Sequence, residues 1–335
     1  MPVCLITQPI HPVGAERLRA AGIEVRHGTA TNAAEQIAEV RDVDAVIVRE
    51  GLSAAAIDAA PHLAVISNHG TGTDKIAVAH AHACGIPVVS TPGANVRAVA
   101  EHTMMLMLAV ARGVVLADAA TRRSDWQHRY TVPMHSLSDK TLGIIGFGRT
   151  GQIVAQMARA GFGMHVVVWS PRVAEQDVAA LGCQRVETLQ ALLQMSDVVS
   201  LHRPLRPDTR HTIDAAALAV MKPGAILVNT SRGGLIDEPA LVDALRAGKL
   251  FGAGLDVFER EPLPVASPLA TLPNVVLSPH QAGSTQEALA DTASQCAAQI
   301  IDALAGRQPE NMLDPSVWQR RRHSGSTQNV MEVQV

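Results

Sequence analysis

Aromatic residues and cysteines are scarce in this sequence. Phe, Trp and Tyr supply 2% of the 335 residues, so aliphatic side chains must do most of the packing. The cysteines are only four, Cys4, Cys84, Cys183 and Cys296, and no two form a C-x-x-C pair. This spacing argues against a disulfide framework or a structural zinc site. We therefore expect no bound metal, and a reducing cytoplasm around the chain.

The sequence also lacks a long apolar run, a basic leader and a strong net charge. Its longest apolar stretch, residues 104–111, stops at Arg112 and is too short to span a bilayer. The N-terminal residues Met-Pro-Val-Cys-Leu-Ile-Thr contain no basic segment, so they predict a strand and not a signal peptide. A formal net charge of −3 gives no attraction to nucleic acid or a membrane surface. We expect neither partner.

Short β-rich runs alternate with helical stretches along the chain. Apolar residues make up 47% and charged residues 18%, which allows large cores and argues against disorder. The alternation predicts an α/β fold with two doubly wound parallel-sheet domains. The predicted strands cover 3–7, 44–48, 63–67, 86–90, 141–146, 164–170, 197–202, 224–230, 251–257 and 274–279, and long helices are predicted near 95–118 and 284–305.

The order of these elements predicts where the domains divide. We expect one continuous domain at 97–285 and another built from 1–96 plus 286–312. Residues 313–335 are polar and unpatterned, which predicts a mobile tail. In such folds small molecules bind beyond the carboxyl ends of the strands, so we expect the site in a cleft between the domains.

The stretch GIIGFGRTG has the glycine spacing of a dinucleotide-binding loop. Gly146, Gly148 and Gly151 follow the order G-x-G-x-x-G, after an apolar strand and before an amphipathic helix. The first glycine permits a tight turn, the second lets the backbone approach a pyrophosphate, and the third lets helix and strand pack closely. The amides of Arg149 and Thr150 would then point at the phosphates. An ordinary glycine turn is the alternative interpretation.

The acid that usually binds the ribose of NAD is missing. It is expected about 20 residues after the glycines, where the sequence VVVWSPR has Ser170. Ser170 does not repel a 2′-phosphate, and Arg172 could pair with one. This pattern favours NADP over NAD. The alternative is that NAD binds through Ser170 and that Arg172 is simply solvated.

An arginine, two carboxylates and a histidine stand at successive strand ends of the same domain. Arg232 lies in NTSRGGLID, and His280 lies in LSPHQAG. Between them, GLDVFEREPLP contains Asp256 and Glu261. A guanidinium can bind a carboxylate or polarise a carbonyl, and a histidine beside a carboxylate can give and take a proton near neutral pH. Each residue alone also fits an ordinary surface role, but together beside a nucleotide-binding segment they favour catalysis.

Several ordered motifs between about residues 44 and 310 resemble those of the D-isomer-specific 2-hydroxyacid dehydrogenases. The resemblance implies a Rossmann cofactor domain, a flavodoxin-like substrate domain and a homodimer. It also implies hydride transfer between NAD(P) and a small 2-keto acid or D-2-hydroxy acid. The motifs are TLGIIGFGRTG, SDVVSLHRPLRPDTRHTID, MKPGAILVNTSRGGLIDE, GLDVFEREPLP, NVVLSPHQAGST, TPGANVRAVAEHTMMLML and the loop NHGTGTDKI.

The same resemblance implies a role for each matching residue. His280 matches the family's general acid/base, Glu261 its partner, and Arg232 the residue that holds the keto acid. Asp256 matches an acid that orients the nicotinamide amide. The residues assigned to the cofactor are Gly146, Phe147, Gly148, Arg149, Thr150, Gly151, Ser170, Arg172, His202, Arg203, Pro204, Thr209, Thr230, Ser231, Arg232, Asp256 and His280.

The substrate residues implied by the resemblance are in part outside that domain. Thr71 and Gly72 match the loop whose amides bind the substrate carboxylate, and Arg49 matches an arginine that faces the substrate. Arg232 and His280 complete the set. The side group of the keto acid stays open among glyoxylate, hydroxypyruvate and phosphohydroxypyruvate types, and so does the physiological direction.

Two other functions of the same fold remain as alternatives. Corepressors of this family sense a dinucleotide and can keep the Arg, Glu and His, so these residues do not exclude such a binding protein. No peptide-docking or basic DNA-contacting segment is evident. A phosphite or formate dehydrogenase is the second alternative, although the ordinary substrate loop and the pairing of Glu261 with His280 argue against it.

Overall fold

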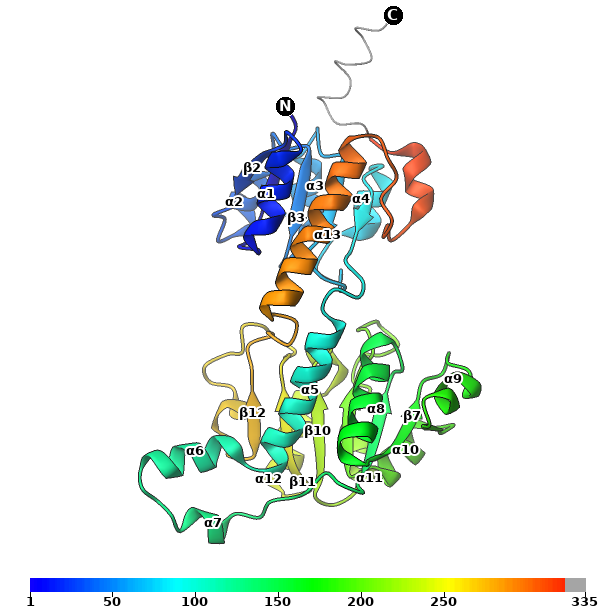
Figure 1. Ribbon diagram of the computed structural model, residues 1–335. Coiled ribbons are helices and arrows are strands. Elements are labelled where there is room, and N and C mark those ends of the chain that lie inside the picture. Colours follow the sequence, from blue (N-terminus) through cyan, green and yellow to red (C-terminus); the bar gives the residue numbers. More distant parts are fainter. Residues whose placement is uncertain (323–335) are drawn as a thin grey trace, which may run out of the picture. The chain divides into compact units, whose positions relative to one another are not determined.

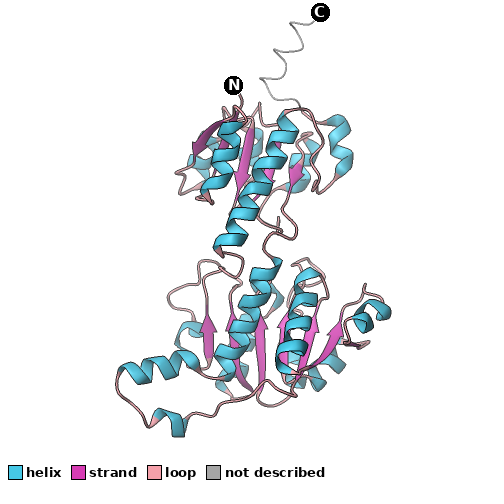
Figure 2. Cartoon of the chain, viewed as in Figure 1, coloured by secondary structure: helices cyan, strands magenta, loops and turns pink. Residues whose placement is uncertain are grey.

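The structure, a computed structural model, describes residues 1–322, and these belong to two compact units (Figure 1). The discontinuous unit combines Met1–Asn95 with the described residues from 284 to 322. The central unit is the continuous segment Val96–Gly283. Each unit has a parallel sheet with helices on both faces (Figure 2). This confirms the predicted α/β fold class.

The discontinuous unit has a five-stranded sheet in the order β2-β1-β3-β4-β5. Every pairing is parallel, and the order 2-1-3-4-5 is that of flavodoxin-like folds. The strands are β1 (Val3–Ile6), β2 (Glu24–His27), β3 (Ala45–Val48), β4 (Val65–Asn68) and β5 (Val88–Val89). The helices are α1 (Pro12–Ala20), α2 (Ala33–Glu39), α3 (Ala54–Asp58), α4 (Val78–Ala83) and α13 (Gln286–Leu304).

Alternation along the buried strands of this sheet creates two cores. Val46 and Val48 of β3 pack in the cluster that contains Ile57 of α3. Ile47, between them, packs in the cluster that contains Ile300 of α13. Successive side chains of a strand point to opposite faces, and a strand covered on both faces is apolar throughout. The C-terminal helix α13 is therefore part of the core built by the N-terminal residues.

The central unit has a seven-stranded parallel sheet in the order β12-β11-β10-β9-β6-β7-β8. Counted from β6, this contains the Rossmann order 3-2-1-4-5-6. The strands are β6 (Thr141–Ile145), β7 (His165–Trp169), β8 (Gln184–Arg185), β9 (Val198–Leu201), β10 (Ala225–Asn229), β11 (Leu250–Leu255) and β12 (Val275–Leu277). The helices are α5 (Val96–Ala111), α6 (Val114–Arg122), α7 (His128–Thr131), α8 (Arg149–Phe162), α9 (Glu175–Ala180), α10 (Leu189–Met195), α11 (Ala215–Val220) and α12 (Glu238–Arg246).

The central sheet also has a core on each face. Ile144 of β6 packs in the cluster that contains Leu106 of α5 and Val154 of α8. Its neighbour Ile145 packs in the cluster that contains Leu192 of α10 and Leu241 of α12. Because helices cover both faces of the sheet, we expect a ligand to bind beyond the carboxyl ends of the strands.

The helix predicted at 95–118 is divided in two. Gly113 adopts a left-handed conformation with φ of 56° and separates α5 from α6. Among residues 1–322, no single helix is long and apolar enough to cross a membrane. Taken together, α5 and α6 have the length and composition of a membrane span, although a bend of 61° separates them. Much of α5 is, however, buried in the core of the central unit. Two further strands, β2 and β8, were not predicted.

The C-terminal segment differs from the mobile tail expected at 313–335. Residues Pro315–Arg320 form the 3-10 helix η3, in which Val317 and Trp318 are buried. Arg322 follows, and its amide donates to Gly85 O at 2.7 Å. The prediction of a mobile tail is therefore wrong for residues 315–322. Val317 and Trp318 hold this segment in place, but the polar residues around them mask this signal in the sequence. The remaining residues, 323–335, lie outside the described part of the chain.

Candidate active site

The glycine-rich loop joins β6 to α8 in the central unit. Gly146 has φ of +95°, and a Cβ there would lie 2.5 Å from the backbone oxygen of His202. A Cβ on Gly151 would lie 2.5 Å from Gly146 O, so helix and strand pack as closely as the motif requires. No atom lies within 4 Å of a Cβ built on Gly148, which caps α8 without a side-chain hydrogen bond. This open turn at a helix N-terminus fits a pyrophosphate.

Three arginines gather at the tip of β7, close to Ser170. The guanidinium of Arg203 lies over the ring of Trp169, 4.9 Å from its centroid. Burial lowers the pKa of Arg203, Asp208 opposes this, and the positive charges of Arg172 and Arg206 lower it further. No ion pair within residues 1–322 involves any of these three arginines. The strand tip is therefore a concentrated positive site.

The loop after β9 holds itself in place by internal hydrogen bonds. His202 Nε2 lies 2.9 Å from Ser200 Oγ, and burial lowers the pKa of His202 to about 4, so its ring is neutral at pH 7. The hydroxyl of Thr209 donates to Pro204 O at 2.8 Å and accepts from the amide of Arg206 at 2.7 Å. Thr209 therefore supports the loop that carries the arginines.

Asn229, at the end of β10, shapes the turn that carries Arg232. Its side chain donates to Arg232 O at 2.8 Å and accepts from Ser231 N at 3.0 Å. The Ser231 hydroxyl donates to Leu201 O at 2.7 Å. A Cβ on Gly233 would overlap the backbone of Phe258, so the Arg232 turn lies directly against the segment after β11. Asn229 is fully buried, and sequence reasoning did not single it out.

Glu261 and His280 form the carboxylate–imidazole pair that the sequence predicted. His280 Nδ1 lies 3.0 Å from both Oε1 and Oε2 of Glu261. The side chain of Glu261 is 20% exposed and that of His280 is 45% exposed. With Nδ1 facing the carboxylate, Nε2 is the ring atom that can exchange a proton with a ligand. His280 has a positive φ of 50°, which is uncommon for a non-glycine residue.

Asp256 holds the loop on which His280 stands. Its buried carboxylate accepts from Ser278 Oγ at 2.7 Å and from the amides of Gln281 and Ala282, both at 2.9 Å. Its backbone oxygen accepts from the His280 amide at 2.8 Å. His102 of α5 extends this network, with Nε2 at 2.8 Å from Ser278 Oγ. Sequence reasoning missed His102, and gave Asp256 a role toward the nicotinamide that stays a prediction.

The predicted substrate loop lies in the discontinuous unit, at the carboxyl ends of β3 and β4. Asn68 donates to Gly70 O at 2.8 Å and to Gly72 O at 3.0 Å, which curls the loop around its side chain. Thr71 and Gly72 are exposed. Arg49 follows β3 and donates to Pro9 O at 2.8 Å. Arg49 and this loop follow the ends of two strands, β3 and β4, that pair in parallel in the same sheet.

Residues 104–282 match the family described as "D-isomer specific 2-hydroxyacid dehydrogenase, NAD binding domain". The chain belongs to this family. The match covers the glycine loop, the Arg232 turn and the pair of Glu261 with His280. It confirms the resemblance inferred from the motifs.

Curated relatives of the 2-hydroxyacid dehydrogenase family agree with the match. The chain is 40% identical over 320 residues to the D-3-phosphoglycerate dehydrogenase of Methanocaldococcus jannaschii, covering 95% of this chain and 60% of that protein. It thus spans about 60% of the length of such relatives. It is 40% identical over 287 residues to the glyoxylate reductase of Thermococcus litoralis, covering 83% of this chain and 86% of that one.

A solved structure has the same fold as this chain. It is an NADPH-dependent glyoxylate/hydroxypyruvate reductase from Sinorhizobium meliloti in complex with NADP and malonate. The TM-score is 0.85 at 30% identity, and the match covers 96% of this chain and 99% of that one. The roles assigned above to single residues of the present chain remain predictions, but the local contacts of these residues are now known.

Proposed function

We propose that the chain is an NAD(P)-dependent D-2-hydroxyacid dehydrogenase. It would transfer a hydride between a nicotinamide dinucleotide and a 2-keto acid/D-2-hydroxy acid pair. The observation that carries the proposal is the pair of 3.0 Å contacts from Glu261 to His280 Nδ1. This pair stands at a strand end of the unit that also contains the G-x-G-x-x-G turn. The reduced nicotinamide, when bound, supplies the hydride.

In this proposal the side chains of the protein transfer the proton and bind the substrate. His280 Nε2 delivers a proton to the oxygen of the keto group, and Glu261 stabilises the imidazolium before that step. The Arg232 guanidinium binds and polarises the keto acid. Arg49 and the amides of Thr71 and Gly72 bind its carboxylate. Both the carboxylate and the carbonyl of the substrate would then be held by groups of fixed geometry.

We propose NADP as the preferred cofactor. Arg172, Arg203 and Arg206 surround the position where other members carry an acid, and no ion pair within residues 1–322 neutralises them. A 2′-phosphate would bring the missing negative charge. The NADPH-dependent reductase of Sinorhizobium meliloti, which has the same fold, supports this cofactor. Ser170 would contact the ribose, and the turn from Gly146 to Gly151 would hold the pyrophosphate.

We propose a small substrate of the glyoxylate, hydroxypyruvate or phosphohydroxypyruvate type. The glyoxylate reductase of Thermococcus litoralis and the D-3-phosphoglycerate dehydrogenase of Methanocaldococcus jannaschii, each 40% identical to this chain, support these choices. The test is the initial oxidation rate of NADPH and of NADH, measured side by side with each keto acid at saturation. Faster oxidation of NADPH supports both proposals. Faster oxidation of NADH contradicts the cofactor preference, and no turnover with any of the three acids contradicts the substrate class.

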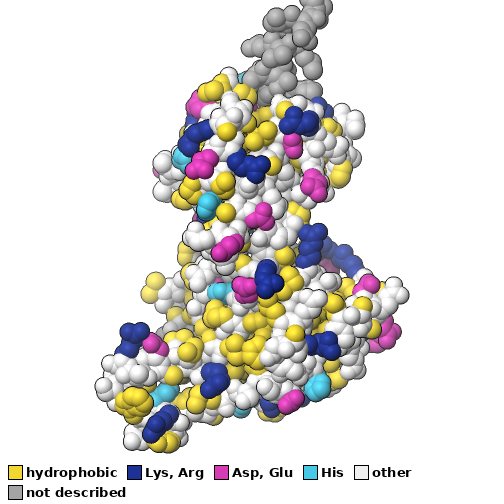
Figure 3. Space-filling view, in the orientation of Figure 1, with side chains coloured by type: hydrophobic (Ala, Val, Ile, Leu, Met, Phe, Trp, Pro, Cys, Tyr) yellow, Lys and Arg dark blue, Asp and Glu magenta, His cyan; other side chains and the backbone are white. Residues whose placement is uncertain are grey.

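We also propose that the enzyme is a homodimer in a reducing cytoplasm. The segment from α6 to α7 exposes Val114, Val115, Leu116, Trp126 and Tyr130, and Figure 3 shows hydrophobic and basic side chains together on this part of the surface. Exposed apolar patches mark interaction surfaces. The four cysteines are free, as expected in a reducing compartment. Light scattering of the purified chain and of Val115→Glu tests the dimer, which the charge should dissociate.

A further inference from the structure

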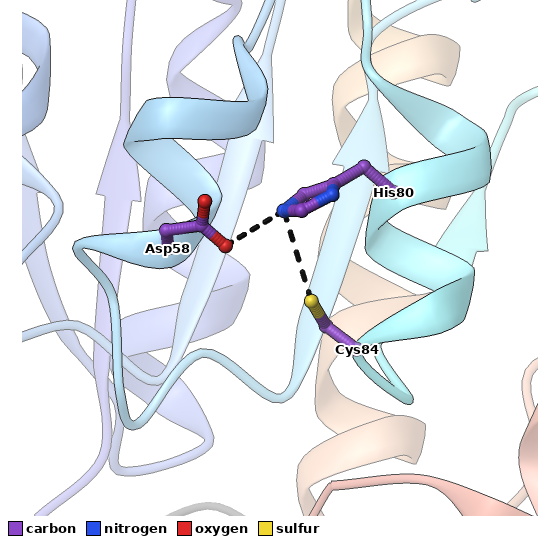
Figure 4. A group of neighbouring side chains, drawn as sticks. All are labelled: Asp58, His80 and Cys84. Carbon is purple, nitrogen blue, oxygen red and sulfur yellow. Dashed lines mark hydrogen bonds and ion pairs between the residues drawn. The ribbon is translucent and has the colours of Figure 1, made fainter.

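A histidine, a cysteine and an aspartate converge at the edge of two helices of the discontinuous unit (Figure 4). Asp58 ends α3, His80 lies in α4, and Cys84 is the C-terminal cap of α4. His80 Nε2 lies 2.7 Å from Asp58 Oδ1 and 3.8 Å from Cys84 Sγ. The three ligand atoms all lie within 4.8 Å of one another. We propose that these side chains bind a divalent transition metal, and that Zn²⁺ fits them best.

The backbone and the core, and not chance rotamers, bring the three residues together. His80 and Cys84 are four residues apart, so they share one face of α4. Ala81 of α4 and Ile57 of α3 are both fully buried in the same hydrophobic cluster. Because this cluster fixes the two helices, Asp58 faces the His80–Cys84 pair across a short gap. A site on such rigid elements is organised before a ligand arrives.

The way the three side chains converge separates a metal site from an activated nucleophile. In a Cys-His-carboxylate triad, the thiol and the carboxylate occupy opposite nitrogens of the imidazole. Here Asp58 and Cys84 both approach His80 Nε2 (Figure 4). The carboxylate therefore cannot orient the ring for attack by the thiol. The three donors therefore converge as three of the four ligands of a tetrahedral metal would.

The donor types and their spacing suit zinc. Tetrahedral Zn²⁺ with bonds of about 2.0–2.3 Å places N and O ligands about 3.3 Å apart and N and S ligands about 3.6 Å apart. The His80–Cys84 distance of 3.8 Å is close to that value. The His80–Asp58 distance of 2.7 Å must open slightly, which the 61% exposed Asp58 side chain permits. Thiolate and imidazole ligands disfavour Mg²⁺ and Ca²⁺, which prefer oxygen.

Metal binding at this site changes the protonation of two residues. The Cys84 thiol loses its proton to solvent, because the thiolate is the ligand. His80 binds through the Nε2 lone pair, so its ring hydrogen must reside on Nδ1. The 37% exposed His80 side chain leaves room for water as the fourth ligand. The metal then links α3 to α4 and stabilises the folded unit, with an affinity that rises with pH.

Cobalt titration of the full-length chain under reducing conditions tests the proposal. Of the four cysteines, only Cys84 is not buried, so a thiolate-to-Co²⁺ charge-transfer band reports on this residue. We expect one Co²⁺ per chain, with visible bands of a tetrahedral site that Zn²⁺ abolishes. Zn²⁺ should also raise the Tm. Asp58→Asn and His80→Gln should weaken binding by at least about tenfold, and Cys84→Ser should remove the charge-transfer band.

Matched variants separate this site from general metal binding. Cys183→Ser and His62→Gln change a buried cysteine and an exposed histidine elsewhere, and both should bind Co²⁺ as the parent chain does. Absence of the bands in the parent chain overturns the proposal. So does the same stoichiometry and affinity in Cys84→Ser. The reductase assay is unaffected by either result, because the three residues take no part in the proposed hydride transfer.

Discussion

At the residue scale, the pair of Glu261 and His280 gives the sharpest prediction. We expect His280→Asn to lower kcat by about 10²–10⁴-fold, because the proton donor is lost. Glu261→Gln should lower kcat less, because the ring keeps a neutral hydrogen-bond partner but loses a charge that stabilises the imidazolium. Steady-state kinetics with the best keto acid measure both effects. Glu287→Gln changes an exposed carboxylate of α13 and serves as the control.

If His280→Asn had the same kcat as the parent chain, His280 would not be the proton donor. The 3.0 Å contacts to Glu261 would then be structural.

The choice of cofactor is also decided by single residues. We expect Arg172→Ala to lower kcat/KM for NADPH by at least about tenfold and to leave the value for NADH nearly unchanged, because a charge-assisted hydrogen bond contributes about 1.5–3 kcal/mol. Arg246→Ala alters an exposed arginine of α12 and should affect neither cofactor. An equal loss with both dinucleotides would show that Arg172 does not read the 2′-phosphate.

Local motifs made part of the site predictable at this scale. The glycine turn and the Glu261–His280 pair follow from residue types in short, ordered segments. Arg172 was visible two residues beyond the missing acid. Arg203 and Arg206 cluster around Arg172 because β6 pairs in parallel with both β7 and β9. These arginines are about 30 residues from Arg172 along the chain, so the sequence alone does not show that they are close in space.

At the element scale, buried hydrogen bonds between distant segments position the catalytic loop. Ser278 joins His102 of α5 to Asp256 after β11, although His102 and Ser278 are separated by 176 residues. No local pattern could pair them. Asn229 is equally hidden, because an asparagine at a strand end is common. These residues are found only once the order of the strands is known.

We expect Ser278→Ala to lower the free energy of unfolding by about 1–3 kcal/mol, because it leaves buried polar partners unsatisfied. It should also lower kcat while changing KM for NADPH little, because the loop that carries His280 loosens. Urea unfolding and steady-state kinetics measure the two effects. Ser316→Ala, at an exposed position, is the control. Full stability together with reduced kcat would assign Ser278 a direct role in the chemistry instead.

The strands that the sequence did not reveal share a physical cause. β2 (Glu24–His27) and β8 (Gln184–Arg185) lie at sheet edges and carry polar, partly exposed side chains. An edge strand needs no continuous apolar run, so it lacks the signal that marks a buried parallel strand. The helix break at Gly113 was missed because an apolar signal is present where no buried helix continues. The apolar residues Val114, Val115 and Leu116 continue the apolar helical pattern of α5, although they are exposed on α6.

At the scale of the whole molecule, the chain leaves its first sheet at residue 95 and returns to it at α13. The apolar face of α13 completes the core under β3 and β4. Each unit thus has its own two-sided core, and two such cores need not unfold together. Within residues 1–322, each unit also has a partly buried histidine beside its candidate ligand loop whose ring is neutral at pH 7, His69 in the discontinuous unit and His202 in the central unit.

These two histidines predict how stability depends on pH in each unit. Burial, and for His69 also the charge of Arg49, lowers both pKa values from 6.5 to about 4. Between these values the unfolded chain binds a proton that the folded chain does not. Stability is therefore undiminished above pH 6.5 and falls as the pH drops toward 4, by up to about 3 kcal/mol for each histidine.

Calorimetry between pH 7.5 and 4.5 measures this dependence. His69→Gln should flatten the pH dependence of the transition that belongs to the discontinuous unit, and His202→Gln should do so for the central unit. His62→Gln removes an exposed histidine and should leave both transitions as in the parent chain. If each variant flattens only one transition, the units unfold separately. If His202→Gln leaves the acid side as steep as in the parent chain, the ring of His202 is protonated in the folded state, and the neutral hydrogen bond to Ser200 is excluded.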